Sequence, residues 1–379
     1  MKILSVFGTR PEAIKMAPVV AELSNHAGEI TSRVCVTAQH REMLDQVLAI
    51  FGIQPDYDLD IMLPGQGLSY VAARILHDLD EVLVDFAPDW LIVQGDTTTA
   101  LAAALAAFHR KVRVAHVEAG LRSGQRDVPF PEEINRRLTD VIADVHFAPT
   151  KRARQHLLDE GVDDGSIEVT GNTVIDALLG VADRTDLPEP ELVTHLRGQN
   201  RRIVLVTAHR RENFGAPIRD ICTAIRGLAC TRDDVHFVYP VHPNPNILGP
   251  VHESLGNLER VTLTSPLSYV ELVQLMKHSH FVLTDSGGLQ EEAPSLGKPV
   301  LVMRDVTERP EAVEAGTARL VGTDPRAIYC WVERLLDDPD EYDRMAHAIN
   351  PYGDGQSRYR IVKRLLATAT HDRLELDPR

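Results

Sequence analysis

The chain has 379 residues, which is more than one hydrophobic core usually organises, so its length predicts two domains. The formal net charge of −15 argues against general attraction to nucleic acid, so any phosphate must be bound by local Arg, Lys and backbone N–H groups. The four cysteines lack metal-ligand spacing and no apolar run approaches the length of a membrane span, so we expect a cytoplasmic protein without a metal site or membrane segment.

The first half of the chain alternates short apolar runs with helical patterns. Strands are predicted at 3–7, 33–37, 90–93, 112–117, 145–148 and 167–170, with helices at 12–24, 68–84, 99–108, 174–181 and one that starts near 132. Asp96 and Glu118 lie at the carboxyl ends of two of these strands, where doubly wound sheets bind their ligands. A catalytic role is one interpretation of these two carboxylates. The alternatives are helix capping by Asp96 and a loop salt bridge for Glu118.

The turn at 8–12 follows the first strand and opens the first helix. Arg10 and Lys15 place positive charge in and next to the first helical turn, where it opposes the helix dipole. An anionic ligand would explain both cations, and solvated surface charge is the alternative. Because the turn lacks the G-x-G-x-x-G pattern, we expect no dinucleotide cofactor.

The second half repeats the same alternation after a polar, proline-rich stretch at 183–190, where a domain boundary is expected. Strands are predicted at 202–207, 235–239, 261–263, 281–283, 300–302 and 319–322, with helices at 269–278, 289–296, 325–337 and 356–370. Strand–helix alternation indicates parallel sheets with right-handed crossovers. The predicted fold is therefore α/β, with two doubly wound, Rossmann-like domains that face a central ligand cleft.

The stretch 285–299 has the clearest functional pattern in the chain. A buried strand leads into Ser286, Gly287 and Gly288, which are expected to form a tight turn at the start of a helix. Free backbone N–H groups and the helix dipole would then attract an anion to this turn. Glu292 lies one helical turn further on, where its carboxylate could accept hydrogen bonds from a ribose. An ordinary strand-to-helix turn is the alternative, but the charged loop that contains Arg309 favours a nucleotide-diphosphate site.

These motifs together resemble a known family, the non-hydrolysing UDP-N-acetylglucosamine 2-epimerases of bacteria. The matching stretches are GTRPE at 8–12, QGDT at 94–97, HVEAGLR at 116–122, PEEINR at 131–136, TGNT at 170–173, HRREN at 209–213 and the run 285–311. The resemblance implies a GT-B fold, a cytosolic homodimer and no redox cofactor. It implies domains at 1–172 and 173–355, and a C-terminal helix at 356–379 that returns toward the first domain before a frayed tail.

The resemblance also assigns substrate contacts. Ser286, Gly287 and Gly288 would bind the diphosphate of UDP, Glu292 would bind the ribose, His209, Arg10 and Arg309 would contact phosphate, and Lys15 would lie near the nucleotide sugar. The family contacts uracil partly through the backbone of 266–272. Leu267 and Leu272 differ there from the family pattern, so no side-chain role is transferred to them.

The implied reaction is reversible inversion at C2, from UDP-GlcNAc to UDP-ManNAc, which supplies ManNAc units for cell-surface polysaccharide. The C2 hydrogen is weakly acidic because no carbonyl lies next to it. Its removal is therefore expected to accompany departure of UDP from C1, in an anti elimination that gives a 2-acetamidoglucal. Asp96, Glu118 and Glu132 are the expected acid–base groups, and His209 completes the catalytic set. For Glu132, stabilisation of a helix dipole is the alternative.

Some members of the family are activated by a second molecule of their own substrate. The residues that resemble that effector site are Gln39, His40, Gln46, Gln66, Glu133, Arg210 and His242. Ala38 replaces a glycine that is expected before Gln39. Solvated polar loops are the alternative interpretation of this set.

Three rival functions remain open from the sequence. A GT-B glycosyltransferase would share the fold and the UDP site but would need an acceptor. A hydrolysing epimerase would release free ManNAc and UDP. A non-catalytic regulator that binds nucleotide sugars would show no turnover. Separately, the motifs are also compatible with a substrate whose sugar carries an additional 3-acetamido or uronate group.

Overall fold

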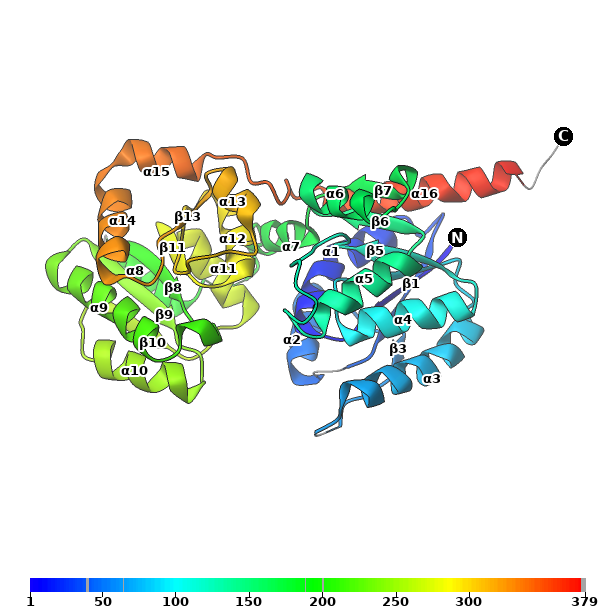
Figure 1. Cartoon of the computed structure of the whole chain (residues 1–379), viewed down its shortest axis with the longest axis horizontal. Helices are drawn as coiled ribbons and strands as arrows, with labels where there is room; N and C mark the ends of the chain where they lie inside the picture. Colours follow the sequence, from blue (N-terminus) through cyan, green and yellow to red (C-terminus); the bar gives the residue numbers. More distant parts are fainter. Residues whose placement is uncertain (39–40, 64, 188, 200, 376–379) are drawn as a thin grey trace. The chain divides into compact units, whose positions relative to one another are not determined.

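Two parallel β-sheets organise the chain, and each belongs to its own compact unit (Figure 1). The structure is a computed structural model that describes residues 1–38, 41–63, 65–187, 189–199 and 201–375. Unit 1 comprises Met1–Ala177 and Tyr352–Arg379, and unit 2 comprises Leu178–Pro351. The chain passes between the units within one helix, α7 (Thr173–Ala182), and returns just before Tyr352.

Unit 1 is built on a seven-stranded sheet with the order β3-β2-β1-β4-β5-β6-β7. The strands are β1 (Lys2–Phe7), β2 (Thr31–Val36), β3 (Tyr57–Asp58), β4 (Trp90–Gln94), β5 (Arg113–Val117), β6 (Val145–Ala148) and β7 (Ile167–Val169). The central strands are continuous apolar runs, because helices cover both faces of the parallel sheet and bury the side chains on both sides. The order of the strands reverses between β1 and β4, and loops at this switch point can line a ligand site.

The helices of unit 1 include α1, which a capping box starts: Thr9 accepts from the Glu12 amide while the Glu12 carboxylate accepts from the Thr9 amide. The helices are α1 (Arg10–Asn25), α2 (Arg41–Phe51), α3 (Leu68–Phe86), α4 (Thr98–His109), α5 (Glu132–Ile142), α6 (Lys151–Asp159), the 3₁₀ turn η1 (Asp164–Ser166) and α16 (Ser357–Glu375). The small alanine side chains of α4 let it pack closely on α3 and on the strands.

Unit 2 has a six-stranded parallel sheet with the order β10-β9-β8-β11-β12-β13. The strands are β8 (Arg202–Thr207), β9 (Val235–Pro240), β10 (Val261–Thr264), β11 (Phe281–Thr284), β12 (Val300–Val302) and β13 (Ala318–Leu320). The helices are α8 (Glu191–Gly198), α9 (Ala216–Thr231), α10 (Pro245–Leu255), α11 (Tyr269–His278), α12 (Gly287–Glu292), α13 (Pro310–Glu314), α14 (Pro325–Asp337) and α15 (Pro339–Ala346), with 3₁₀ turns η2 (Arg211–Asn213) and η3 (Ala293–Leu296). The predicted helix at 289–296 is thus a short α-helix that tightens into a 3₁₀ turn.

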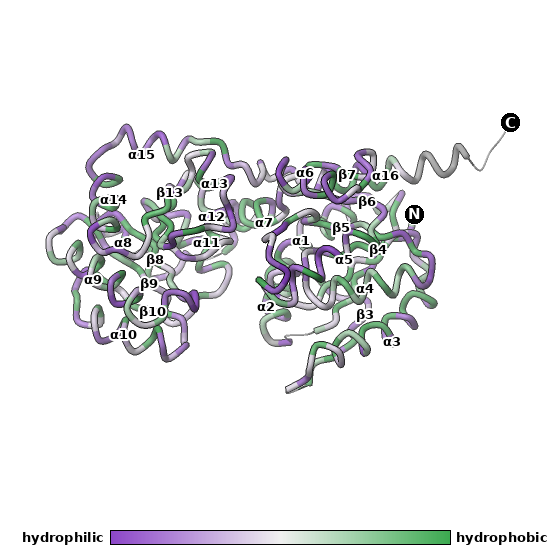
Figure 2. Tube along the Cα trace, viewed as in Figure 1, coloured by the Kyte–Doolittle hydropathy of each residue, from purple (hydrophilic) through white to green (hydrophobic). Residues whose placement is uncertain are grey.

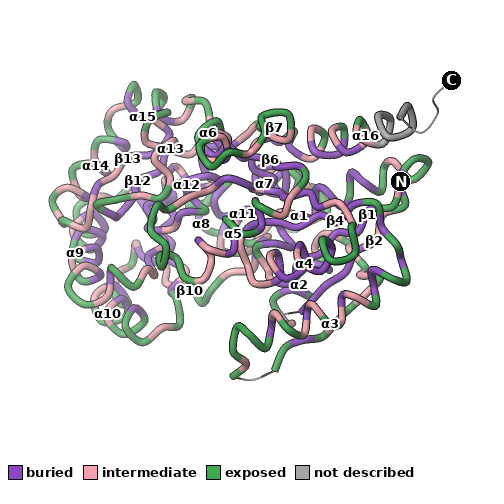
Figure 3. The backbone as a smooth tube through the Cα atoms, turned by 45° about the vertical axis from the view of Figure 1, so that its right-hand side comes forward, coloured by how far each residue is buried: buried purple, intermediate pink, exposed green. Residues whose placement is uncertain are grey.

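The hydrophobic core of each unit lies between its sheet and the helices on either side. Figure 2 shows hydrophobic colouring along the strands, and Figure 3 shows the same strands as buried while the outer sides of the helices are exposed. None of the helices among the described residues combines the length and apolar composition that a membrane crossing requires.

The C-terminal helix is anchored inside unit 1. Asp176 on α7 accepts hydrogen bonds from the Ser357 and Arg358 amides, at 3.2 and 3.0 Å, and so caps the start of α16. The Asn172 amide donates to the Tyr352 carbonyl oxygen at 2.6 Å. Helix α16 then packs against α1, so the last segment of the chain completes the first unit.

A pair of glycines near β5 provides a stability test of the loop that follows it. Gly120 has φ +83°, and a Cβ added there would lie 2.3 Å from the Ala153 carbonyl oxygen, whereas Gly124 has φ +74° and open space within 4 Å. Both Gly→Ala changes carry left-handed strain of about 1 kcal/mol. The added clash should bring the loss for Gly120→Ala to about 3 kcal/mol. Urea unfolding followed by circular dichroism measures both, and equal midpoints for the two variants would contradict this account.

Candidate functional site

The turn at Ser286–Gly288 lies at the carboxyl end of β11, beside the switch point between β8 and β11. The Ser286 side chain makes no capping bond to α12, so its hydroxyl is not committed to the helix end. A Cβ on Gly287 would lie 3.5 Å from Arg210 Nη2 and 4.0 Å from Arg309 Cζ. Two guanidinium groups therefore flank this turn, which gives it the positive surroundings that an anion requires.

A cavity of about 240 Å³ opens next to this turn in unit 2. Its lining residues are Thr207, His209, Pro240, His242, Pro266, Leu267, Leu272, Ser286, Gly288, Leu289 and Glu292. Polar groups from the turn and α12 meet flat or branched apolar groups from the 266–272 segment. This combination suits a ligand with a polar ribose–phosphate part and a planar ring.

Asp285 holds the neighbouring loop in place. It is fully buried, and its Oδ2 accepts from the amides of His209 and Arg210, both at 2.8 Å, and from Asn213 Nδ2 at 2.9 Å. Its Oδ1 lies 3.5 Å from His209 Nδ1. The His209 ring stacks on that of His242 with 5.7 Å between ring centroids. Asp285 therefore fixes the backbone at His209 and Arg210, while its Oδ1 has no hydrogen-bond partner in the described residues.

The cations around the turn are paired with carboxylates. Arg309 Nε donates to Glu291, and Arg304 Nε donates to Glu212 Oε1 at 2.5 Å. Arg304 also lies 3.6 Å from Glu308. The sequence predicted Arg309 as a phosphate ligand but did not predict these partners, which lie 18 residues away for Arg309 and 92 residues away for the Arg304–Glu212 pair.

In unit 1, Asp96 and Glu118 leave neighbouring strands at the same edge, since Gln94 of β4 pairs in register with Val117 of β5. Asp96 Oδ2 accepts from Arg136 Nη2 at 2.5 Å. The Glu118 carboxylate is nearly buried and lies 2.5 Å from Lys15 Nζ. Each predicted catalytic carboxylate therefore has a cationic neighbour.

Glu118 accounts for part of the charge pattern at the start of α1. Lys15 pairs with Glu118, so its place near the positive end of a helix is balanced by a carboxylate 103 residues away in the sequence. Arg10 is half-buried at the first residue of α1. Glu12 is buried and accepts from the Gly8 and Thr9 amides at 3.0 and 2.7 Å, which fixes the turn that carries Arg10.

Helix α5 begins with the two remaining predicted acids. Glu132 is its first residue, and one of its carboxylate oxygens is buried without a hydrogen-bond partner. Glu133 is almost fully buried, accepts from the Ser123 amide at 3.0 Å and lies 3.3 Å from Arg136 Nη1. Glu133 therefore positions the guanidinium that contacts Asp96.

The other predicted effector residues are spread over both units. Gln39 and His40 lie outside the described residues. Gln46 is exposed on α2, and the Gln66 side chain accepts from the Leu63 amide at 3.0 Å. Arg210 and His242 lie in unit 2 beside the Ser286–Gly288 turn, as described above.

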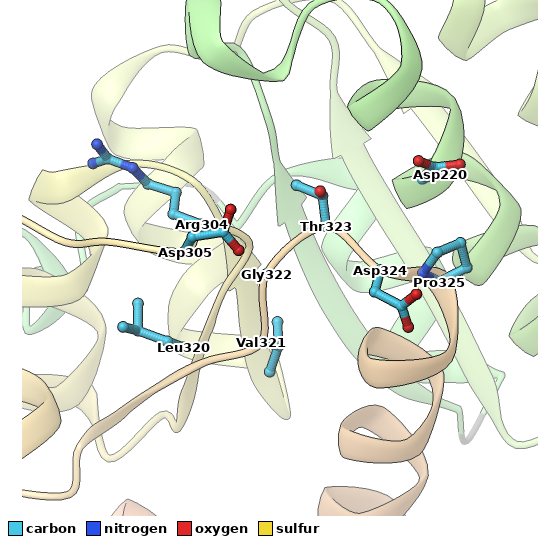
Figure 4. A pocket seen from close by; sticks show the side chains of 9 residues that line it. All are labelled: Asp220, Arg304, Asp305, Leu320, Val321, Gly322, Thr323, Asp324 and Pro325. Atoms are coloured by element: carbon cyan, nitrogen blue, oxygen red, sulfur yellow. The ribbon is translucent and has the colours of Figure 1, made fainter.

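A larger cavity of about 600 Å³ lies over the ends of β12 and β13. Its lining residues are Asp220, Arg304, Asp305, Leu320, Val321, Gly322, Thr323, Asp324 and Pro325 (Figure 4). The Arg304 guanidinium points away from Thr323 and Asp324 in this view. The Asp324 carboxylate caps α14 by accepting from the Arg326 and Ala327 amides. The polar groups do not converge, so this cavity is not the candidate site.

Within the described ranges, no group of three or more His, Cys, Asp or Glu side chains is arranged to hold a metal ion.

The two parallel-sheet α/β units, with their polar loops at the carboxyl edges, define a protein of the GT-B fold class. The family model of UDP-N-acetylglucosamine 2-epimerase matches residues 21–366. The chain belongs to this family, which confirms both the predicted fold class and the predicted resemblance.

Individual relatives agree with the family assignment. A UDP-N-acetylglucosamine 2-epimerase of Salmonella typhimurium is 56% identical over 370 residues, which cover 96% of this chain and 98% of the relative. The crystal structure of the Neisseria meningitidis enzyme bound to UDP-GlcNAc is similar, with a TM-score of 0.86, 49% identity and coverage of 97% and 100%. The Methanocaldococcus jannaschii enzyme in complex with UDP-GlcNAc and UDP gives a TM-score of 0.77 at 35% identity, with coverage of 97% and 100%.

The His209 ring allows a titration test of its surroundings. Burial lowers its pKa below the usual value, Asp285 opposes this shift, and Arg210 and His242 add to it. We expect His242→Gln to raise the pKa of His209 and Asp285→Asn to lower it, because a nearby negative charge favours the imidazolium. NMR titration of the ring protons measures both changes, with His252→Gln on the exposed side of α10 as the control. Shifts of the same sign in the two variants would contradict this assignment.

Proposed function

We propose that the protein is a UDP-N-acetylglucosamine 2-epimerase of the non-hydrolysing type. It would interconvert UDP-GlcNAc and UDP-ManNAc by inversion at C2 and supply ManNAc units for cell-surface polysaccharide. The family match supports the epimerase activity, and the relatives bound to UDP-GlcNAc and UDP support the substrate. The observation that carries the proposal is the pair Asp96 and Glu118, two carboxylates at adjacent strand ends with cationic neighbours.

The proposed reaction is an elimination followed by re-addition. A carboxylate removes the C2 proton, and the electron pair of the C2–H bond forms the C1–C2 double bond. The C1–O bond breaks at the same time, and UDP departs with the electron pair of that bond to leave a 2-acetamidoglucal. UDP then adds back to C1 as C2 is protonated on the opposite face. Asp96, Glu118 and Glu132 are the proposed acid–base groups, and His209 completes the set. Arg136 and Lys15 supply positive charge beside two of these acids whenever a proton is accepted or returned.

The nucleotide is proposed to bind at the cavity of unit 2. Its backbone amides and hydroxyl at Ser286–Gly288 would bind the diphosphate, and Glu292 would bind the ribose. The 266–272 segment lines the same cavity and would contact uracil, partly through its backbone. The proposed contacts to phosphate are Arg10, His209 and Arg309, and Lys15 would lie near the nucleotide sugar.

Isotope exchange tests the mechanism directly. In heavy water, the epimerised product should carry deuterium at C2, because a proton held on a carboxylate exchanges with solvent before it returns. Oxygen-18 placed in the C1–O–P bridge should scramble into non-bridging diphosphate positions, because the C1–O bond breaks. Proton NMR of the C2 position measures the deuterium. Phosphorus-31 NMR of the recovered UDP-GlcNAc measures the scrambling, because the isotope shift differs between bridging and non-bridging oxygen-18.

The outcomes separate the rival functions. Deuterium at C2 without oxygen scrambling would exclude elimination, and neither exchange would point to transient oxidation. Accumulation of free ManNAc and UDP would identify a hydrolysing epimerase. Turnover only with an added acceptor would identify a glycosyltransferase, and tight UDP binding without any turnover would identify a regulator.

Arg309 provides a test of the nucleotide site. Arg309→Ala should weaken UDP binding by about 10-fold or more, because a hydrogen bond to a charged group contributes about 1.5–3 kcal/mol. The change also leaves Glu291 buried without this partner, so the variant Arg309→Ala with Glu291→Gln separates binding from folding. Calorimetry with UDP measures the affinity. Arg319→Ala is the matched control, since Arg319 stacks on Trp331 in the same unit.

If UDP affinity is unchanged in both Arg309 variants, Arg309 does not contact the phosphate.

We also propose a cytoplasmic homodimer. Activation by a second UDP-GlcNAc is a further hypothesis for the effector residues named above. Sedimentation of the purified protein tests the dimer separately from the reaction.

A further inference from the structure

One buried ion pair in unit 1 has no part in the mechanism above. His116 on β5 is fully buried, and Asp140 on α5 is almost fully buried. His116 Nδ1 lies 2.6 Å from Asp140 Oδ1, and its Nε2 lies 2.7 Å from the Gly95 carbonyl oxygen. Both ring nitrogens therefore face oxygen acceptors at hydrogen-bond distance.

This geometry defines the protonation of the pair. A carbonyl oxygen can only accept, so Nε2 must carry a proton. Asp140 Oδ2 accepts from Arg122 Nη2 at 2.8 Å and from the Gly120 amide at 3.3 Å, which are the contacts of an ionised carboxylate. Burial alone would raise the pKa of Asp140, but His116 and Arg122 outweigh it and lower that pKa. Both ring nitrogens and both carboxylate oxygens of the pair therefore have a partner at hydrogen-bond distance.

The two ends of this pair hold the two loops that carry the proposed catalytic acids. The His116 end binds the carbonyl of Gly95, the residue immediately before Asp96. The Asp140 end binds the amide of Gly120, two residues after Glu118. Glu118 itself has φ +68°, in the left-handed region that a non-glycine residue adopts only under constraint. A single buried unit is thus attached to both loops.

We propose that His116 and Asp140 act together as a positioning pair that fixes the Asp96 and Glu118 loops relative to each other. This inference rests on the proposed function only in assigning catalysis to those two carboxylates. Neither member touches the substrate, so both are positioning residues. Proton transfer at C2 depends on the placement of two acids, and a displacement of about 1 Å can cost about 100-fold in rate.

Variants that keep or remove the hydrogen bonds distinguish positioning from charge. His116→Phe and Asp140→Leu retain bulk but remove donors or acceptors to both loops. We expect each to lower kcat about 100-fold while KM and UDP affinity change less than about three-fold. Asp140→Asn can accept from Gly120 and Arg122 and donate to a neutral His116, so it should restore at least about 10-fold of the kcat lost in Asp140→Leu.

The matched control is Asp144→Leu. Asp144 is exposed and accepts from the Val114 amide at 2.7 Å. Val114 lies near the start of β5, the strand that also carries His116. This variant can lower stability, but it should leave kcat within about two-fold of the wild-type value because it touches neither loop. A purely structural role for the pair would instead make all four variants lose activity in proportion to their loss of folded protein.

Two readouts do not depend on turnover. Nitrogen-15 NMR of His116 in the full-length protein should show a proton on Nε2 in the wild type and in Asp140→Asn, because this nitrogen faces the Gly95 carbonyl oxygen. Amide hydrogen exchange at 95–97 and 118–120 should speed up in His116→Phe and Asp140→Leu but not in Asp144→Leu. An unprotonated Nε2 in the wild type, or unchanged exchange in both loops, would overturn the proposal. Absence of wild-type epimerisation with these readouts intact would remove the proposed function and leave the positioning pair.

Discussion

The cost of burying a carboxylate is the constraint on which the loops of both units depend. A buried carboxylate requires hydrogen-bond donors, and in this protein the donors come from loops at the carboxyl edges of the sheets. Glu12 holds the turn after β1, Asp140 holds the turn after β5, and Asp285 holds the loop after β8. The type of donor matters: burial raises the pKa of Glu12 despite its neutral donors, whereas cations lower that of Asp140 against burial. These loops are therefore fixed before any ligand binds.

The sequence predicted the sheets well because parallel strands buried on both faces are continuous apolar runs. It missed β3, which has only two residues and pairs at the edge of the sheet. It also missed α15, although Asp338 and Pro339 form a cap and first-turn proline at its start. No bounds were predicted for α6, α8, α9, α10 or α13 either. A systematic search for that capping pattern would have found α15. Capping residues are therefore a useful guide to helices that the apolar pattern alone did not identify.

For the site, the sequence could place Asp96 and Glu118 at strand ends but could not supply their partners. Lys15 and Arg136 lie 103 and 40 residues away along the chain, and only the packed sheet brings them close. The same holds for Asp285, which the sequence showed only as the residue before a glycine turn. Its three donors come from a loop more than 70 residues earlier. Sequence position identifies groups that can react, while tertiary contacts determine which groups control them.

Pairing of the functional charges also affects how an anion can bind. The chain carries a formal net charge of −15, and both arginines beside the unit 2 turn already have a carboxylate neighbour: Glu308 for Arg210 and Glu291 for Arg309. A phosphate that contacts Arg309 must therefore share this guanidinium with Glu291 or displace it, so part of the new interaction replaces an old one. The free energy of phosphate binding is then less favourable than it would be at an unpaired arginine. In return, the carboxylate keeps Arg309 oriented when no phosphate is bound. Under the elimination and re-addition proposed above, such an exchange would be an advantage, because a site that bound the leaving group too tightly would slow its return to C1.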